Sequence, residues 1–409
     1  MSGFLRTHIK EECFGCEACI QACHKDAIHM EEDDEGFRYP VIDNDKCVDC
    51  GACNKVCPYE NLPEKNLGEH YVFGGYIKDL DVRDKSTSGG IFSALVDAWC
   101  DENYVIFGAE AKGLEIYHSC IENKAQIDLF RKSKYSQSHV GDSYLKAKKY
   151  LAEGKKVLFS GTPCQIAALK NILGKAANTE KLLTIEVVCE GFPSPLLLRK
   201  YEQHLAEKKG IKFDSLDYRY KDGARWDYEV MNITYTEQHN PNGGTIKRDR
   251  WFNPFWIFWA ARLMSRPSCV TCPFRTPDRE ADITLGDLWG AHLYCPELYG
   301  NNNGCSLAVC NTEKGKTVLK KAEPNLYGHE LLYDDALKFQ RPMRVVVPAD
   351  PRRDEFMEDL KAMTYQELCD KWKPRESFKV LFKKYVCGKN SQVVKMWEIK
   401  NRLKSFFKI

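Results

Sequence analysis

Cysteines near the N-terminus occur twice at one spacing. A run of the form C-x2-C-x2-C-x3-C is followed by a second run with the same spacing, which ends just before Pro58. Thiolates at this spacing wrap three corners of a [4Fe–4S] cluster, and the fourth thiolate of each run binds the other cluster. The sequence therefore predicts two clusters. The expected ligands are Cys13, Cys16, Cys19 and Cys57 for one cluster, and Cys47, Cys50, Cys53 and Cys23 for the other.

Zinc is the alternative metal for closely spaced cysteines. Zinc sites need four ligands and usually take them from two separated C-x2-C pairs. Two runs of four cysteines, both ending in x3-C, fit zinc poorly, so iron–sulfur clusters are favoured. His24 stands where the first run would normally carry proline. Because that proline shapes the exit turn and binds no iron, the cluster prediction is unchanged.

Four later cysteines could also converge on one site. Cys164 lies where a predicted strand ends and a helix begins, and the helix dipole favours a thiolate there. Cys189 ends the next predicted strand, and Cys269 and Cys272 form a C-x2-C pair. Cysteines at the ends of successive parallel strands lie near each other, and the pair can come beside them. These four thiols suit a further [4Fe–4S] cluster or a structural zinc, and spacing alone does not decide between them.

The total number of cysteines, together with the N-terminal sequence, bears on the cellular compartment of the protein. The chain has 19 cysteines, which would indicate disulfides in a secreted protein, but its N-terminus lacks an apolar signal segment. Cluster spacing without such a segment favours a reducing cytoplasm. The cysteines without a partner at ligand spacing are predicted to be buried free thiols. They are Cys100, Cys120, Cys295, Cys305, Cys310, Cys369 and Cys387.

The composition is that of a globular protein. The apolar fraction is 43% and the formal net charge is +2, so no global field indicates binding to nucleic acid. The richest apolar run, residues 251–261, is too short to span a membrane and contains Pro254. Neither a G-x-G-x-x-G after a strand nor a G-x-x-x-x-G-K-[ST] loop is present. A nicotinamide-dinucleotide domain and a P-loop are therefore not indicated.

Hydrophobic periodicity predicts an α+β / α/β fold with three parts. These are a small two-cluster module at residues 1–65, a larger α/β domain at 71–325, and a C-terminal extension at 326–409. Strands are expected at 104–109, 156–160, 182–188, 228–235, 245–250, 281–289 and 306–309, and helices at 91–100, 141–152, 162–173, 195–208, 254–264 and 314–322. Strand–helix–strand order with short links implies crossovers and a mostly parallel mixed sheet.

Several short motifs resemble those of the coenzyme F420 hydrogenase/dehydrogenase beta-subunit family, whose relatives include 7-hydroxymethyl chlorophyll a reductase. The motifs are residues 160–165 (SGTPCQ), 188–193 (VCEGFP), 266–274 (RPSCVTCPF) and 282–290 (DITLGDLWG), with 88–90 (SGG) and 133–138 (SKYSQS) as further likenesses. They follow the family's order, and the resemblance covers roughly residues 1–325. The cysteine runs ahead of them resemble those of bacterial two-cluster ferredoxins.

The resemblance implies an iron–sulfur flavoprotein oxidoreductase. The second domain would bind FAD and one [4Fe–4S] cluster, with Cys164, Cys189, Cys269 and Cys272 as ligands. Electrons would pass between a protein such as ferredoxin and an organic substrate, since a flavin beside clusters couples two-electron to one-electron chemistry. Coenzyme F420 is one implied substrate, although family members that do not use it exist. Similar proteins also occur in bacterial surface-polysaccharide biosynthesis.

Polar residues of these motifs are candidates for holding the flavin. Backbone N–H groups in residues 88–90 and 161–162 are expected at helix N-termini, where they bind phosphate groups. Lysine, glutamine and aspartate side chains nearby could reach the phosphate, ribose or ring. The candidates are Ser88, Gly89, Gly90, Lys134, Gln137, Gly161, Thr162 and Asp287. His139 is a candidate proton donor, although a lone histidine is more often structural.

The C-terminal tail has a basic amphipathic pattern. Apolar residues recur there at helical spacing among lysines and an arginine. They are Met396, Trp397, Ile399, Leu403, Phe406 and Phe407 among Lys395, Lys400, Arg402, Lys404 and Lys408. Such a helix can lie on an anionic membrane, so peripheral contact with the inner membrane face is one expectation. A helix docked on its own domain or on a partner is the alternative.

Two other functions fit the same sequence. A non-catalytic electron-transfer subunit would hold clusters and a stable partner enzyme. A scaffold with the fold but without the second-domain cofactors would leave Cys164, Cys189, Cys269 and Cys272 as free thiols or zinc ligands. All four cysteines stand in positions that match the family's motifs, which argues against the scaffold.

Overall fold

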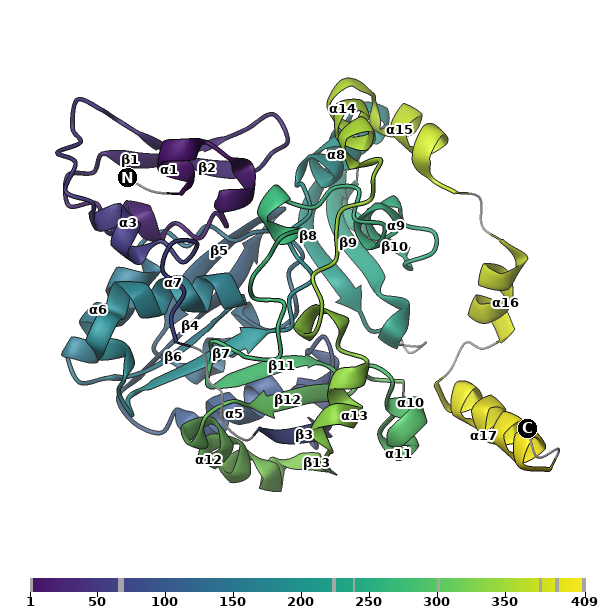
Figure 1. The fold of residues 1–409 in the computed structure, drawn as a ribbon. Helices are drawn as coiled ribbons and strands as arrows, with labels where there is room; N and C mark the ends of the chain where they lie inside the picture. Colours follow the sequence, from purple (N-terminus) through teal and green to yellow (C-terminus); the bar gives the residue numbers. More distant parts are fainter. Residues whose placement is uncertain are drawn as a thin grey trace.

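The computed structural model describes residues 3–64, 70–222, 226–237, 240–299, 302–374, 377–386 and 390–406. The N-terminal module packs on α6 (Ser143–Ala152) and α7 (Pro163–Leu173), two helices that cover a large mixed sheet, and a second, smaller sheet stands beside both (Figure 1). The last two helices lie at the edge of the molecule. This arrangement confirms the predicted α+β / α/β class with a small ferredoxin-like module in front of a larger mixed-sheet domain.

The module consists of a hairpin and short helices that begin in the cysteine loops. Its elements are α1 (Phe4–Thr7), α2 (Ala18–Gln21), β1 (Ile28–Glu32), β2 (Arg38–Ile42) and α3 (Ala52–Val56). The strands pair antiparallel, with Ile28 opposite Ile42. Asp33 closes the hairpin, because its Oδ1 accepts the Phe37 N–H at 2.8 Å. Side chains at hairpin ends often replace a missing backbone partner in this way.

The large sheet has the strand order β13-β3-β12-β11-β7-β6-β4-β5. Its strands are β3 (Tyr71–Ile77), β4 (Tyr104–Lys112), β5 (Glu115–Ile121), β6 (Lys156–Gly161), β7 (Leu182–Val187), β11 (Ile283–Asp287), β12 (Ser306–Cys310) and β13 (Leu326–Glu330). Parallel pairing joins β4, β6, β7 and β11, whereas the other neighbouring pairs are antiparallel. The parallel character expected of the sheet is thus confined to its centre. β4 and β5 must run antiparallel because a tight turn at Gly113 joins them.

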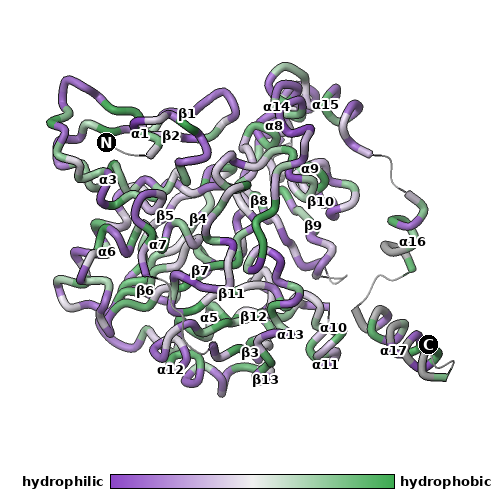
Figure 2. Tube along the Cα trace, in the orientation of Figure 1, coloured by the Kyte–Doolittle hydropathy of each residue, from purple (hydrophilic) through white to green (hydrophobic). Residues whose placement is uncertain are grey.

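Helices cover both faces of this sheet. α5 (Ile91–Trp99) and α12 (Glu313–Ala322) share a core with Leu158 of β6. Val157 and Phe159, on either side of it, pack instead with α6 (Ser143–Ala152) and α7 (Pro163–Leu173). The alternation along β6 is what a strand buried on both faces requires. Figure 2 shows hydrophobic segments around β6 and α5.

The smaller sheet is antiparallel, in the order β10-β9-β8. Its strands are β8 (Ile211–Tyr220), β9 (Val230–Glu237) and β10 (Asn240–Arg248), and the helices α8 (Leu196–Lys209), α9 (Pro254–Ala260), α14 (Arg353–Ala362) and α15 (Tyr365–Trp372) pack with it. A hairpin was expected here with its turn at residues 240–244, whereas the structure places these residues within β10, where the pairing register shifts between Asn240 and Gly244. Trp256 and Phe258 of α9 are fully buried in this second core.

The chain after residue 325 continues the sheet domain. β13 pairs antiparallel with β3, with Leu326 opposite Ile77. The boundary expected after residue 325 therefore falls inside the sheet. The remaining helices are α4 (Leu80–Asp84), α10 (Ala291–Tyr294), α11 (Pro296–Tyr299), α13 (Tyr333–Lys338), α16 (Phe378–Val386) and α17 (Asn390–Phe406). Among the described helices, none has the length and apolar character to cross a bilayer.

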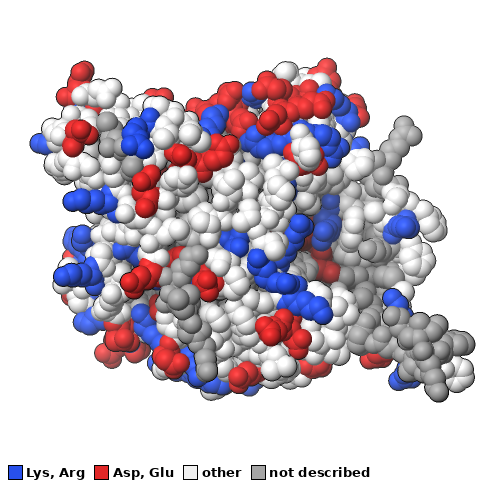
Figure 3. Space-filling model, viewed as in Figure 1, with Lys and Arg blue, Asp and Glu red and all other residues white. Residues whose placement is uncertain are grey.

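Charged side chains of both signs are interspersed over the surface around α8, α14 and α15 (Figure 3). The acidic hairpin of the module makes ion pairs with this region. Glu32 pairs with Arg199 at 2.5 Å, and Asp34 pairs with Lys361 at 2.8 Å. Because such exposed pairs contribute little stability each, the module must be held mainly by buried contacts.

Candidate functional site

The eight module cysteines line two adjoining cavities. The first is lined by Cys13, Cys16, Cys19, Cys53 and Cys57, and the second by Cys23, Cys47, Cys50 and Cys53. The structure thus brings Cys57 to the first run and Cys23 to the second, which is the exchange that the spacing predicts. Backbone N–H groups also point at the sulfurs, from Gly15 to Cys13 Sγ at 3.4 Å and from Ala27 to Cys23 Sγ at 3.3 Å. Such donors are typical of cluster ligands.

The four later cysteines line one further cavity. Cys164 lies in the first turn of α7, Cys189 follows β7, and Cys269 and Cys272 come from one loop. Gly191 has φ +100°, and a Cβ there would lie 2.9 Å from Cys269 Cβ. Glycine is therefore needed for the two loops to meet. The structure brings together all four thiols that the sequence singled out.

The surroundings of this cavity fit a [4Fe–4S] cluster. Burial raises the pKa of the Cys189 thiol to about 12 and that of Cys272 to about 11, so a bound cation is needed to keep them as thiolates. The Gly191 N–H points at Cys189 Sγ and the Phe192 N–H at Cys269 Sγ, each at 3.4 Å. Within the described ranges, no three His, Cys, Asp or Glu side chains are placed to hold one single metal ion.

A buried arginine joins the module to the domain. Arg266 is 0% exposed, and its guanidinium donates to the carbonyls of Cys13 and Arg38 and to Gln137 Oε1, each at 3.0 Å. Its guanidinium also lies 4.3 Å from the ring centre of Tyr39. The residue stands at the start of the 266–274 motif, yet no local pattern in the chain assigns it a role. It fixes the first cysteine loop against the C-x2-C loop.

Two predicted site residues lie elsewhere. Gln137, expected to contact the flavin, uses its amide to donate to the carbonyls of Phe14 and Gly15, both at 2.8 Å. It therefore holds a cysteine loop. His139, the candidate proton donor, accepts from the Arg38 guanidinium at Nδ1 and donates from Nε2 to Glu115 Oε2 at 3.2 Å. It lies between module and domain and does not line the large cavity described next.

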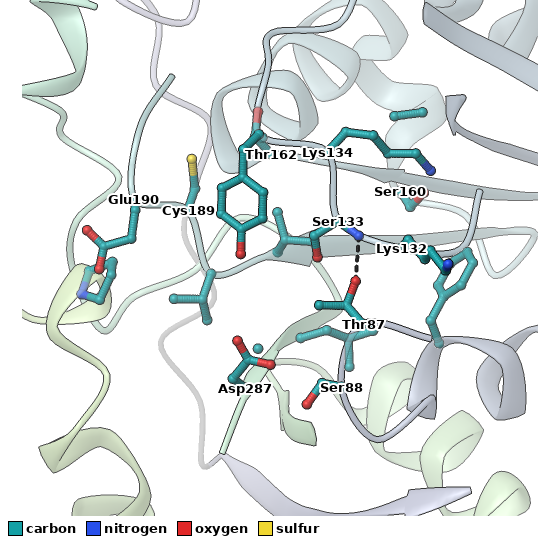
Figure 4. A pocket seen from close by; sticks show the side chains of 18 of the residues that line it. Thr87, Ser88, Lys132, Ser133, Lys134, Ser160, Thr162, Cys189, Glu190 and Asp287 are labelled. Atoms are coloured by element: carbon teal, nitrogen blue, oxygen red, sulfur yellow. Dashed lines mark hydrogen bonds between the residues drawn. The ribbon is translucent and has the colours of Figure 1, made fainter. Parts of the chain in front are cut away.

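A cavity of about 630 Å³ opens beside the four-cysteine site. Figure 4 shows Lys134 and Thr162 along one side, Ser88 and Asp287 along the other, and Cys189 at one end. The predicted residues that line it are Ser88, Gly90, Lys134, Gly161, Thr162 and Asp287. A volume of this size is ordinary for a cofactor or a drug-sized ligand.

Gly89 supports this cavity without lining it. Its N–H donates to Ser306 Oγ at 2.8 Å. A Cβ at Gly89 would lie 2.4 Å from the carbonyl oxygen of Gly75, so only glycine allows this close backbone approach. Gly90 follows with φ +82° and caps α5, whose first residue, Ile91, lines the cavity. This helix start is the position where a phosphate would be favoured.

At the start of α7, a backbone N–H group that was predicted to bind an anion already has a partner within the chain. Thr162 and Gln165 form a capping box, in which the Thr162 N–H donates to Gln165 Oε1 at 3.0 Å. That donor is therefore occupied within the chain. Gly161 is the last residue of β6 and lies opposite Glu186 of β7. Both residues shape the cavity wall.

Lys134 and Asp287 supply opposite charges on the two sides of the cavity. The Lys134 Nζ donates to the carbonyls of Leu129 at 3.1 Å and Arg131 at 2.7 Å. Burial lowers the pKa of Lys134 to about 7. Asp287 forms a buried ion pair with Arg219 of β8, and its backbone carbonyl accepts from Gln340 at 2.7 Å.

His118 lines the cavity and was not predicted. Its Nε2 lies 3.1 Å from the carbonyl oxygen of Ser160, so Nε2 must carry the proton. Its Nδ1 then accepts from Ser138 Oγ at 2.8 Å, and Ser138 Oγ accepts from Gln165 Nε2 at 2.9 Å. Burial lowers the pKa of His118 to about 4. The His118 ring is therefore neutral near neutral pH and has a fixed tautomer. It forms part of the cavity wall and does not act as an acid there.

The four cavities form a continuous series. Cys53 lines both module cavities. Phe14 lines the first module cavity and also the four-cysteine cavity. Cys189 and Phe192 line the four-cysteine cavity and also the large cavity. Each prospective redox site therefore shares at least one wall residue with the next.

Comparisons with known proteins distinguish the same N-terminal module from the larger domain. Residues 154–330 match the family described as the C terminus of the coenzyme F420 hydrogenase/dehydrogenase beta subunit, and residues 12–61 match the 4Fe-4S dicluster domain. A ferredoxin 7Fe of Hydrogenibacillus schlegelii is 46% identical over 52 residues, 12% of this chain and 60% of that protein. A ferredoxin of Alicyclobacillus acidocaldarius is 44% identical over 61 residues, 14% of this chain and 72% of that protein.

Among solved structures, the F420-reducing [NiFe] hydrogenase complex of Methanosarcina barkeri aligns with a TM-score of 0.41 and 16% identity. The alignment covers 76% of this chain and 94% of that chain. The family assignment itself comes from the two sequence matches. Residues 154–330 thus form a domain similar to the C terminus of the coenzyme F420 hydrogenase/dehydrogenase beta subunit, and a 4Fe-4S dicluster domain precedes it at residues 12–61.

Proposed function

We propose that the chain is an iron–sulfur flavoprotein oxidoreductase that passes electrons between a ferredoxin-type protein and an organic compound. The observation that carries this proposal is the continuous series of cavities from the module to the 630 Å³ cavity. Twelve cysteines stand along the first three cavities of that series, with Cys53 lining two of them, and twelve is the number that three clusters with four ligands each require. Neighbouring sites share wall residues such as Phe14, so we expect single electrons to pass between them.

FAD is the proposed occupant of the large cavity. Bound there, a flavin supplies the link between two-electron chemistry on an organic compound and one-electron transfer to clusters. Ser88, Gly90 and Lys134 would hold its phosphates at the start of α5, whereas Asp287 lies where it would meet a ribose or ring. Cys189 at the end of the cavity brings the third proposed cluster beside it.

The electron partner is proposed to dock at the second module cavity. Cys50 is exposed, whereas the other proposed ligand cysteines are half-buried or buried. Val48, beside it, is 57% exposed. A small redox protein such as ferredoxin could therefore bring its own centre close to this end of the series. Coenzyme F420 or another organic compound would react at the opposite end, and a role in surface-polysaccharide biosynthesis stays a prediction.

A non-catalytic electron-transfer subunit is the alternative. The similarity of residues 154–330 to a hydrogenase/dehydrogenase beta subunit favours a stable partner enzyme, and a chain of this kind could pass electrons on without a flavin of its own. Anaerobic purification followed by iron, zinc and flavin quantitation on one sample separates the two. About twelve iron atoms and one FAD per chain would support the oxidoreductase, whereas about eight iron atoms without flavin would support the electron-transfer subunit and refute the enzyme.

Flavin binding should weaken as pH rises through about 7. Lys134 has a pKa of about 7 in this structure, and the protonated form alone attracts a phosphate. Binding should therefore be full below this pH, and the dissociation constant should rise by up to tenfold per pH unit above it. Flavin fluorescence titrations between pH 6 and about 9 measure this. A Lys134→Met variant should bind more weakly at low pH and lose the dependence, and an unchanged pH profile in that variant would exclude the role.

Membrane contact through the C-terminal helix also stays a prediction. Val394 of α17 packs on the core beside α11, while Met396, Ile399, Leu403 and Phe406 are exposed. The exposed apolar residues lie on the face opposite Val394, with Lys395, Lys400 and Arg402 near its borders. Co-sedimentation of the full chain with anionic but not neutral vesicles tests this, and Leu403→Glu should abolish it.

A further inference from the structure

Arginines surround the four-cysteine cavity, and their charges are compensated to different degrees. Arg262 pairs with Glu190, and the buried Arg279 pairs with Glu186. Arg279 also donates to the Phe274 carbonyl at 2.9 Å. These two guanidinium charges are each neutralised by a neighbouring carboxylate, so they add little net field at the cavity.

Arg275 differs from both. It lines the cavity, is 6% exposed, and donates from Nη2 to the backbone carbonyl of Glu190 at 2.7 Å. Its Nη1 is buried and makes no hydrogen bond within the part of the chain that the structure describes. No carboxylate there forms an ion pair with it. A buried guanidinium with an unused donor and no counter-charge is costly, which indicates that an anion normally completes this site.

The charges that line the neighbouring module cavity have the opposite sign. The charged residues in that wall are Glu12 and Glu17, of which Glu17 is paired with Arg38, whereas those in the four-cysteine wall are Arg275 and Arg279, of which Arg279 is paired with Glu186. A cluster held by four thiolates is an anion, and reduction adds one more negative charge. Nearby cations therefore stabilise the reduced form, and nearby carboxylates oppose it.

We propose that Arg275 is a positioning residue that compensates the four-cysteine cluster and raises its reduction potential, so that electrons run from the module toward the large cavity. The inference rests on the proposed third cluster. In the step concerned, one electron leaves the neighbouring module cluster and one electron is gained at the four-cysteine site. No bond is made or broken in this step, and no proton moves.

Potentiometric titration of the full anaerobic protein, followed by electron paramagnetic resonance, tests this inference. The signal absent from a Cys272→Ser variant identifies the four-cysteine cluster. At the potential where that cluster is half reduced in the original protein, Arg275→Gln should lower its reduced-to-oxidised ratio about tenfold, which is about 59 mV for one electron. Arg275→Lys keeps the charge and should change the ratio less than about threefold.

The module signals serve as the internal control and should keep their potentials in both variants. A retained cluster with an unchanged potential in Arg275→Gln would overturn the inference. If that variant fails to hold the cluster, Arg275→Lys decides, since a tenfold shift with the charge retained would refute compensation by charge. About eight iron atoms in the original protein would instead refute the proposed function, so the two failures are distinguishable.

Discussion

Replacing Cys272 with serine should remove about four of about twelve iron atoms per chain and leave the two module clusters in place. The reason is that Cys272 lines only the cavity it shares with Cys164, Cys189 and Cys269, whereas the module cavities draw on other cysteines. A serine hydroxyl is a far weaker ligand than a thiolate. The visible absorbance of the anaerobic protein should fall by about one third, in step with the iron.

The matched control is Cys120→Ser. Cys120 is half-buried, lies on β5 and lines none of the three cysteine cavities, so its loss should leave the iron content unchanged. Iron that survives in full in Cys272→Ser would show that the ligand assignment is wrong. One zinc atom in place of four iron atoms in the original protein would decide for the structural zinc that the spacing left open.

Local chemistry explains what the sequence could predict. The spacing of the cysteine runs predicts which cysteines share a cluster, because one tight loop can supply ligands to only three corners of a cluster. Leu158 of β6 lies in a short apolar run next to turn-forming residues, and α7 begins at Pro163 after a capping residue. These signals lie within a few residues of each other along the chain. The elements that hold Cys164 and Cys189 were therefore predictable to within one or two residues.

Tertiary contacts explain what the sequence could not predict. His118 lies on β5, a strand formed because a tight turn at Gly113 folds it back on β4. Gln137 stands in a motif that suggested flavin contact, but its partners are carbonyls more than a hundred residues away. Nothing local distinguishes the buried Arg266 from a surface arginine. The docking of the module is set by such long-range pairs.

Glu17 shows how strong that docking should be. It is 5% exposed, its Oε1 accepts from Arg38 at 2.6 Å, and its Oε2 accepts the N–H groups of Val140 at 2.7 Å and Gly141 at 2.8 Å. The sequence alone does not distinguish Glu17 from the other acidic residues of the module. In the structure it is the carboxylate that binds a cysteine loop to the start of α6. Its position fixes the first module cavity beside the four-cysteine cavity.

Glu17→Gln should therefore loosen the module from the domain. The change leaves Arg38 without its counter-charge and turns an amide N–H toward donors, which typically costs about 3 kcal/mol for a buried pair. Hydrogen exchange at Val140 and Gly141 should accelerate about a hundredfold, since each 1.4 kcal/mol is about a factor of ten. Mass spectrometry of peptides that cover these residues in the full chain measures this.

The same variant should separate docking from cluster assembly. All eight module cysteines remain, so about eight module iron atoms should stay bound. Electron transfer from reduced ferredoxin to the flavin proposed for the large cavity should slow. Glu12→Gln is the matched control, because Glu12 lines the same cavity but bonds to Thr7 within the module. It should leave exchange at Val140 unchanged. Equal hydrogen-exchange rates at Val140 in the two variants would show that Glu17 does not hold the module against the domain. Other contacts would then have to keep the cavities adjacent.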